Sequence, residues 1–183
     1  MIITLSLIIL ELVVFIIFIF LFLAQIIAAL TTDAPFIPVP DEIDNEILAN
    51  LNLTSGSVLY DLGCGDARIL IKAVKKFQNV RAVGVEKAII PYCLAKFNSR
   101  KYVDIQIRRE DIFDTDISSA THIFVYLYPK VINKLICNIK NQCKGGTRLV
   151  SCDFQLDKIL PNKMIELNNP NQKRGKRLFI YII

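Results

Sequence analysis

The sequence lacks the usual marks of a metalloprotein. It has one histidine, and none of its five cysteines stands in a C-x-x-C pair or near that histidine at a spacing typical of metal ligands. We therefore expect no metal site. The cysteines are instead typical of reduced, mostly buried thiols, and their odd number favours a reducing compartment.

Basic residues are also absent from the first 67 positions, most of which are apolar. Residues 12–30 (LVVFIIFIFLFLAQIIAAL) carry no charge and one polar side chain, Gln25. As a helix this run spans about 28 Å, close to the hydrocarbon core of a bilayer. A cleaved signal peptide would instead have a basic first region and a shorter apolar core. We predict a transmembrane anchor in residues 1–30 that contacts the lipid bilayer through residues 12–30.

The rest of the chain holds all 22 Lys and Arg residues, a balance that suits an anionic partner, a membrane surface or simply a solvated basic face. Three prolines in residues 31–40 (TTDAPFIPVP) predict a stiff, extended tether. Asp41 is expected to cap a helix that runs to about Leu51. Residues 31–56 are therefore interpreted as a tether and a first helix, followed by one domain over residues 57–183.

Within residues 57–183, short apolar runs alternate with amphipathic ones. We expect strands at 57–62, 80–86, 104–108, 122–127, 147–152, 163–167 and 177–183, and helices at 68–77, 88–99 and 131–141. Continuously apolar strands that alternate with helices indicate a parallel sheet covered on both faces. The fold class is α/β.

The turn after the first of these strands lacks a third glycine. In DLGCGDARI, Gly63 and Gly65 let the backbone approach a ligand closely. The dinucleotide fingerprint G-x-G-x-x-G needs a glycine where Arg68 stands, and the Asp61 carboxylate disfavours a pyrophosphate. A cationic ligand without phosphate fits better, so the turn favours S-adenosylmethionine, whose ammonium Asp61 can attract. A turn that only connects two elements is the alternative.

Two further acids follow the next two strands. Glu86 can accept hydrogen bonds from both ribose hydroxyls, each worth about 1.5 to 3 kcal/mol. Asp111 can accept one from the adenine amino group while Ile112 packs on the ring, and Cys64 lies in the glycine turn itself. Each acid alone is equally compatible with a solvated turn. Their order along the chain favours one nucleoside site at the carboxyl ends of the strands.

The motifs DLGCGDARI, VGVE, REDIF and VYLYP resemble the motif series of class I S-adenosylmethionine-dependent methyltransferases. More narrowly, residues 35–155 resemble the small protein-lysine N-methyltransferases related to the ATP synthase c-subunit lysine methyltransferase, through PFIPVP, DLGCGDARI, YLYPKVINKL and GTRLVSCDF. Ala67 departs from that family, which usually has glycine there. The resemblance implies a Rossmann-like sheet, mostly parallel with an antiparallel last strand, preceded here by one transmembrane helix.

The resemblance also implies methyl transfer to a lysine of a protein, here one at or in the membrane. Tyr126, Tyr128 and Pro129 stand where this superfamily places its acceptor-facing loop. Because side chains alternate along a strand, one tyrosine can face the site, and we favour Tyr128. The segment Phe36–Pro40 is expected to fold over the cofactor. Since S-adenosylmethionine is made inside the cell, a single-pass protein with its catalytic domain facing the cytoplasm is expected.

Two other functions stay open. One is methyl transfer to a nucleic acid or a small molecule, although YLYP stands where enzymes that methylate base amino groups carry an N/D-P-P-Y motif. The other is a non-catalytic membrane module that binds S-adenosylmethionine.

Overall fold

The computed structural model describes residues 2–31, 38–157, 159–167 and 173–183. The chain divides into two compact units, residues 1–35 and 36–183. The first contains one 30-residue helix, α1 (Ile2–Thr31). By length and composition its stretch Thr4–Ile27 could cross a membrane, a property that it shares with signal sequences near an N-terminus. The expected tether lies almost entirely outside the described residues, as do Phe36 and Ile37.

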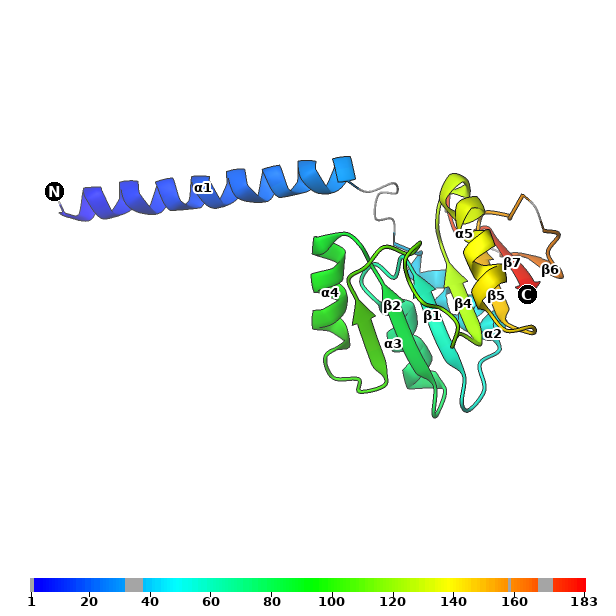
Figure 1. Cartoon of the computed structure of the whole chain (residues 1–183). Helices are drawn as coiled ribbons and strands as arrows, with labels where there is room; N and C mark the ends of the chain where they lie inside the picture. The colour runs from blue at the N-terminus through cyan, green and yellow to red at the C-terminus, as the bar shows by residue number, and fades with distance from the viewer. Residues whose placement is uncertain (1, 32–37, 158, 168–172) are drawn as a thin grey trace. The chain divides into compact units, whose positions relative to one another are not determined.

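The second unit is built on a seven-stranded sheet (Figure 1). Its strands are β1 (Val58–Leu62), β2 (Arg81–Val85), β3 (Ile105–Arg108), β4 (His122–Val125), β5 (Arg148–Cys152), β6 (Lys163–Glu166) and β7 (Arg177–Ile182). They lie in the order β3-β2-β1-β4-β5-β7-β6. Strands β1 to β5 pair in parallel, and β7 is antiparallel to both β5 and β6. This confirms the mostly parallel α/β sheet with an antiparallel last strand.

Helices cover the sheet because their apolar residues recur on one side. The helices of this unit are α2 (Asp44–Leu51), α3 (Arg68–Lys76), α4 (Ile89–Ser99) and α5 (Pro129–Gln142). In α3, Ile69, Leu70 and Ala73 are buried at the helical spacing expected from the sequence. Figure 1 shows α5 in front of the strands and α2 and α3 behind them.

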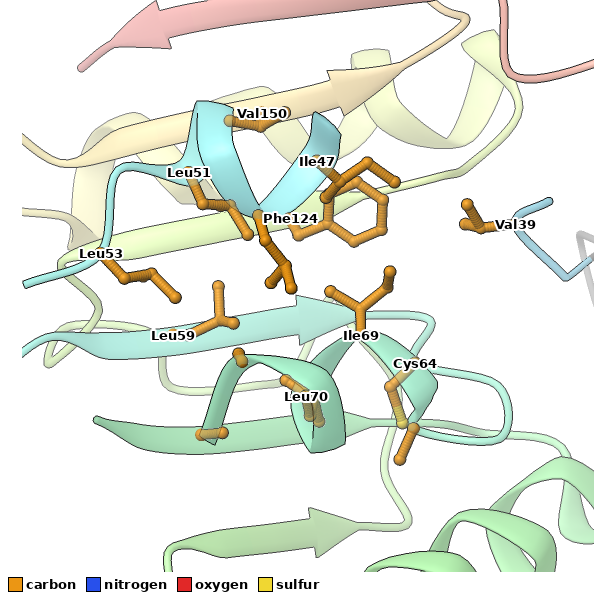
Figure 2. Packing of buried hydrophobic residues seen from close by; sticks show 14 of the residues in the cluster. Val39, Ile47, Leu51, Leu53, Leu59, Cys64, Ile69, Leu70, Phe124 and Val150 are labelled. Atoms are coloured by element: carbon orange, nitrogen blue, oxygen red, sulfur yellow. The ribbon is translucent and has the colours of Figure 1, made fainter. Parts of the chain in front are cut away.

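The main core lies between α2, α3 and the sheet. Figure 2 shows Ile47 and Leu51 of α2 beside Phe124 and Val150, and Leu70 of α3 in the same cluster. The segment that precedes β1 is therefore part of the same compact unit as the sheet. This packing matters for the site, because it fixes the start of α3 and the chain before α2 against the carboxyl ends of β1 and β4.

The expected role of Asp41 as a helix cap is wrong. A 3₁₀ turn, η1 (Asp41–Ile43), precedes α2, and neither element has a side-chain cap. The Asp41 carboxylate instead accepts a hydrogen bond of 2.6 Å from Nη1 of Arg68. A guanidinium is charged as well as a donor, so it competes effectively with a backbone N–H for a carboxylate.

Candidate active site

The strand order reverses between β1 and β4. From β1 the chain builds outward through β2 and β3, and it then returns to place β4 on the other side of β1. Ligands of open α/β sheets bind at such a point, outside the carboxyl ends of the strands. The turn at residues 63–67 follows β1 there, and Tyr126 follows β4.

The glycine turn has the backbone that its sequence predicts. Gly63 has φ of 88°, and a Cβ built on it would lie 2.9 Å from Cδ2 of Leu127. The N–H groups of Gly63 and Cys64 both donate to the Val85 carbonyl, at 2.9 and 3.0 Å. The backbone of the turn is thus held against the end of β2. A side chain at position 63 would collide with the loop after β4.

A cavity opens beside this turn. It is lined by Pro38, Val39, Asp61, Gly63, Cys64, Gly65, Asp66, Arg68, Ile69, Phe124 and Tyr126. The lining combines the glycine turn, the end of β4 and two residues of the proline-rich segment. Four of the predicted cofactor residues line it, namely Asp61, Gly63, Cys64 and Gly65, whereas Glu86, Asp111 and Ile112 do not belong to this lining.

Asp61 is the most unusual group in the cavity. Its side chain is 3% exposed, and within the described part of the chain no donor bonds its carboxylate. Burial raises the pKa of Asp61 well above the usual range for a carboxyl, and the negative charges of Glu86 and Asp66 raise it further. A buried carboxylate without a donor is costly. The site is therefore prepared for a cation that would pair with it.

Glu86 lies directly after β2 and braces the glycine turn. Its Oε2 accepts from the Gly65 N–H at 3.1 Å, and its Oε1 accepts from the Ala88 N–H at 2.9 Å. Burial raises the pKa of Glu86, and these backbone N–H groups oppose that shift. Each carboxylate oxygen has two lone pairs, so each can accept a second hydrogen bond from a ligand.

Arg68 joins the proline-rich segment to the glycine turn. Its Nε and Nη2 donate to the Asp66 carboxylate at 3.0 and 2.8 Å, and its Nη1 donates to the Val39 carbonyl at 3.2 Å and to Asp41. The sequence drew attention to Arg68 only as the missing third glycine. The structure shows that it holds Val39 at the cavity.

Asp111 is already engaged within the protein. Its Oδ2 accepts from Nζ of Lys87 at 2.9 Å, and its Oδ1 accepts from the Phe113 N–H at 3.0 Å. Burial alone would raise the pKa of Asp111, but the Phe113 N–H and the Lys87 ammonium outweigh it, and the pKa is lowered. The proposed contacts of Asp111 and the half-buried Ile112 with adenine stay predictions.

The two tyrosines after β4 have different surroundings. Tyr126 lines the cavity and its hydroxyl donates to Oδ2 of Asp153 at 3.3 Å. Tyr128 is 39% exposed and precedes Pro129, the first residue of α5. Both rings pack against Phe154, with centroids 6.4 and 6.1 Å away. Tyr126 is thus closer to the cavity than the favoured Tyr128, and the roles of all three residues stay predictions.

Asp153 is a residue that the sequence analysis did not single out. It follows β5, as Asp61 ends β1, and it accepts from the backbone N–H groups of Gly175, Lys176 and Arg177 as well as from Tyr126. An acid at the carboxyl end of a third central strand was the available signal. Gly84 in β2 was also missed: a Cβ there would lie 2.7 Å from Sγ of Cys64 and 2.8 Å from Cδ1 of Leu70.

Cys64 is a packing residue in this arrangement. Its side chain is buried beneath the turn, and burial first, with the charges of Asp61 and Glu86, raises the pKa of its thiol far above the usual value. A thiol that stays protonated is a poor nucleophile. All five cysteines are free of disulfides.

Known proteins with this sequence pattern are methyltransferases. The profile of the ANTKMT methyltransferase domain matches residues 61–163. A protein-lysine N-methyltransferase from Saccharolobus islandicus (strain REY15A) is 31% identical over 152 residues, which cover 81% of this chain and 93% of that protein. An ATP synthase c-subunit lysine N-methyltransferase from Caenorhabditis elegans is 22% identical over 131 residues, 67% of each chain.

Solved structures give the same class. An RNA methyltransferase from Salinibacter ruber, crystallised with S-adenosyl-L-homocysteine, has a TM-score of 0.74 and 31% identity, over 80% of this chain and 94% of that one. A precorrin-6y C5,15-methyltransferase from Geobacter metallireducens GS-15 has a TM-score of 0.59 at 15% identity and covers 81% of this chain and 92% of that one; this likeness concerns the fold alone.

The sheet order and the glycine turn, together with these similarities, identify a class I methyltransferase that uses S-adenosylmethionine. Within that class, the chain belongs to the ANTKMT methyltransferase domain family.

Proposed function

We propose that this protein transfers a methyl group from S-adenosylmethionine to a lysine side chain of another protein, from a position at a membrane. The observation that carries the lysine acceptor is the similarity to the archaeal protein-lysine N-methyltransferase, which extends over 93% of that enzyme. The nematode relative, named for a component of a membrane complex, supports an acceptor at or in the membrane.

The residues around the glycine turn fit the cofactor. Asp61 supplies an unpaired buried carboxylate for its ammonium, and Gly63, Cys64 and Gly65 supply close-packed backbone. Glu86 keeps acceptor capacity for the ribose hydroxyls, and Asp111 with Ile112 is assigned to the adenine. The bound sulfonium supplies an already activated methyl group, so the protein mainly has to position and desolvate the acceptor.

Tyr126, Tyr128 and Pro129 are assigned to the acceptor side. Tyr126 has the stronger support because it lines the cavity next to Phe124. A lysine amine must be neutral to attack, and hydroxyl and carbonyl oxygens can align its N–H bonds. The exposed ring of Tyr128 is suited to contact the aliphatic part of an incoming side chain.

The membrane part of the proposal rests on α1. Its 24-residue stretch Thr4–Ile27 is long enough to span a bilayer. Residues 32–37 extend over at most about 22 Å, and Pro38 and Val39 already line the cavity. A spanning α1 would therefore confine the active site to the membrane surface. Because the cofactor is made inside the cell, we assign the catalytic domain to the cytoplasmic side.

Incubation of the purified chain with S-adenosylmethionine carrying a tritiated methyl group and with a membrane protein extract tests this function. We expect radioactivity in protein, and mass spectrometry should assign it to methyl-lysine. Isothermal titration should show cofactor binding, weakened by about 2 kcal/mol or more in Glu86→Ala because the ribose bonds are lost. A chain that binds no S-adenosylmethionine would overturn the proposal.

Methyl transfer to RNA is the second candidate, because the structural neighbour from Salinibacter ruber is an RNA methyltransferase at 31% identity. The same labelled incubation with total RNA in place of protein separates the two. Label in RNA and none in protein would replace lysine by a nucleotide as the acceptor. Cofactor binding without transfer to either would favour a binding module.

A further inference from the structure

We propose that Asp153 is a positioning residue that orients the hydroxyl of Tyr126, so that the Tyr126 oxygen accepts a hydrogen bond from the acceptor amine in the cavity. The inference rests on the proposed lysine acceptor. Nothing in the family resemblance or in the relatives' names assigns a role to Asp153.

The contacts around Asp153 are unusually complete. Oδ2 accepts from the Gly175 N–H at 2.6 Å and from the Tyr126 hydroxyl at 3.3 Å. Oδ1 accepts from the N–H groups of Lys176 at 2.6 Å and Arg177 at 3.2 Å. Asp153 adopts this geometry with φ of 62°, a left-handed conformation that aspartate tolerates better than most residues. Three backbone donors thus fix its carboxylate beside the tyrosine.

The turn that supplies these donors is itself fixed. Gly175 has φ of 69°, and a Cβ there would lie 2.7 Å from Cδ1 of Ile43 and 3.2 Å from Cγ of Pro40. The turn therefore packs on the chain that follows Val39, which lines the cavity. Asp153 and Tyr126 lie between two walls of the same site, and neither can shift without moving one of them.

This geometry determines the polarity of the Tyr126 hydroxyl. An ionised carboxylate has no proton to donate, so the hydroxyl must be the donor in the bond to Asp153. The lone pairs of the Tyr126 oxygen are then left for another partner. Burial, together with the Asp153 charge, also raises the pKa of Tyr126, which keeps the hydroxyl protonated.

An acceptor at this position is what a lysine amine requires. A neutral amine has two N–H bonds and one lone pair, and the lone pair must attack. As the N–C bond forms, the C–S bond breaks and its electron pair stays on sulfur, leaving S-adenosylhomocysteine and an alkylammonium that loses a proton to water. If Tyr126 accepts an N–H, the lone pair stays available for the methyl group. If its hydroxyl instead donated to the amine, it would occupy that lone pair and oppose attack.

Two variants and their combination test the inference. In Asp153→Asn the amide has one acceptor oxygen for three backbone donors, and its NH₂ can donate to the Tyr126 oxygen, which reverses the polarity. Tyr126→Phe removes the hydroxyl and leaves the Asp153 backbone contacts in place. Asp157→Asn is the matched control, since Asp157 accepts from Asn133 at an exposed site. Initial rates are measured with saturating tritiated cofactor and a membrane protein extract, and cofactor affinity by titration.

We expect Asp153→Asn and Tyr126→Phe each to lower the rate about tenfold or more, with cofactor affinity changed less than about threefold. The double variant should be no slower than the slower single variant, within about twofold, because both act on one hydrogen bond. Asp157→Asn should match the wild type. Multiplying losses in the double variant, or a Tyr126→Phe rate near wild type, would overturn the inference alone. A wild-type chain that binds cofactor but labels no protein would overturn the proposed function, and this inference with it.

Discussion

Two aspartates at the carboxyl ends of β1 and β5 have opposite surroundings. Asp61 is buried, has no donor within the described part of the chain, and lies near two other carboxylates, those of Glu86 and Asp66. Asp153 accepts from three backbone N–H groups and a tyrosine hydroxyl. Both lie at the same edge of the sheet.

The difference separates a ligand-binding group from an organising one. A carboxylate that the protein satisfies is committed to holding its neighbours in place. A carboxylate that the protein leaves unsatisfied costs stability until a cation arrives, so its presence indicates a ligand. The same residue type therefore has two roles here, distinguished by hydrogen bonding and not by burial or position along a strand.

The largest expected effect of breaking this contrast is on cofactor affinity. Asp61→Asn removes the buried charge that would pair with the cofactor's ammonium, and we expect binding to weaken by about 3 kcal/mol, more than 100-fold. Isothermal titration measures this. Asp157→Asn, an exposed control, should leave the affinity unchanged. An Asp61→Asn chain with wild-type affinity would show that the carboxylate is not the ammonium partner.

The packing beneath the glycine turn gives the next largest effect, because Asp61 can be held without a donor only in a rigid surrounding. We expect Gly84→Ala to lower the free energy of unfolding by about 1 to 3 kcal/mol, since its Cβ would collide with Cys64, Leu70 and Ile107. Gly145→Ala is the control, with nothing within 4 Å of its Cβ. Urea unfolding measures both, and equal effects would contradict the packing argument.

The same substitution should change stability in opposite directions at the two aspartates. Because the folded-state pKa of Asp61 is raised, the stability of its protonated form is fully present below about pH 3.8 and is lost as pH rises through the folded-state pKa. Asp61→Asn should abolish that loss, worth about 1.4 kcal/mol per pH unit, and stabilise the cofactor-free chain at neutral pH.

Asp153→Asn should instead destabilise the chain by about 1 to 3 kcal/mol, since backbone donors lose their acceptor. Unfolding in urea between pH 4 and 8 compares the two variants. Shifts of the same sign in both would show that hydrogen bonding does not distinguish the two carboxylates.

The smallest effect is expected at Ala67, which is fully buried and has φ of 65°. Glycine would relieve about 1 kcal/mol of left-handed strain. It would also lose about 0.8 kcal/mol of methyl burial and gain freedom in the unfolded chain. Ala67→Gly should therefore change stability by less than about 1 kcal/mol and cofactor affinity by less than threefold. A tenfold gain in affinity would show that the methyl group intrudes on the cofactor site.

Local patterns predicted most of the fold. The apolar runs that became β1, β2, β4 and β5 and the helical spacing in α3 depend on neighbours a few residues apart, and their bounds were confirmed within a few residues. The glycine turn was predictable for the same reason. Asp41 was mispredicted as a cap because its actual partner, Arg68, lies 27 residues away.

The contacts that shape the site were harder to predict. Glu86 braces Gly65 across 21 residues, Arg68 reaches the Val39 carbonyl across 29, and Asp153 meets Tyr126 across 27. Alternation along a strand correctly limited the choice between Tyr126 and Tyr128 but did not select the one that lines the cavity. That choice depends on how the chain turns after Val125, where the strand ends.

The sequence by itself determined the class of fold, the glycine turn and the residue types offered to a cofactor, because periodicity and turn chemistry are local properties of the chain. Only the tertiary structure decided which carboxylate is left without a donor and which is satisfied. Hydrogen bonding of a buried group depends on distant segments brought to one sheet edge, and in this protein that distribution separates Asp61 from Asp153.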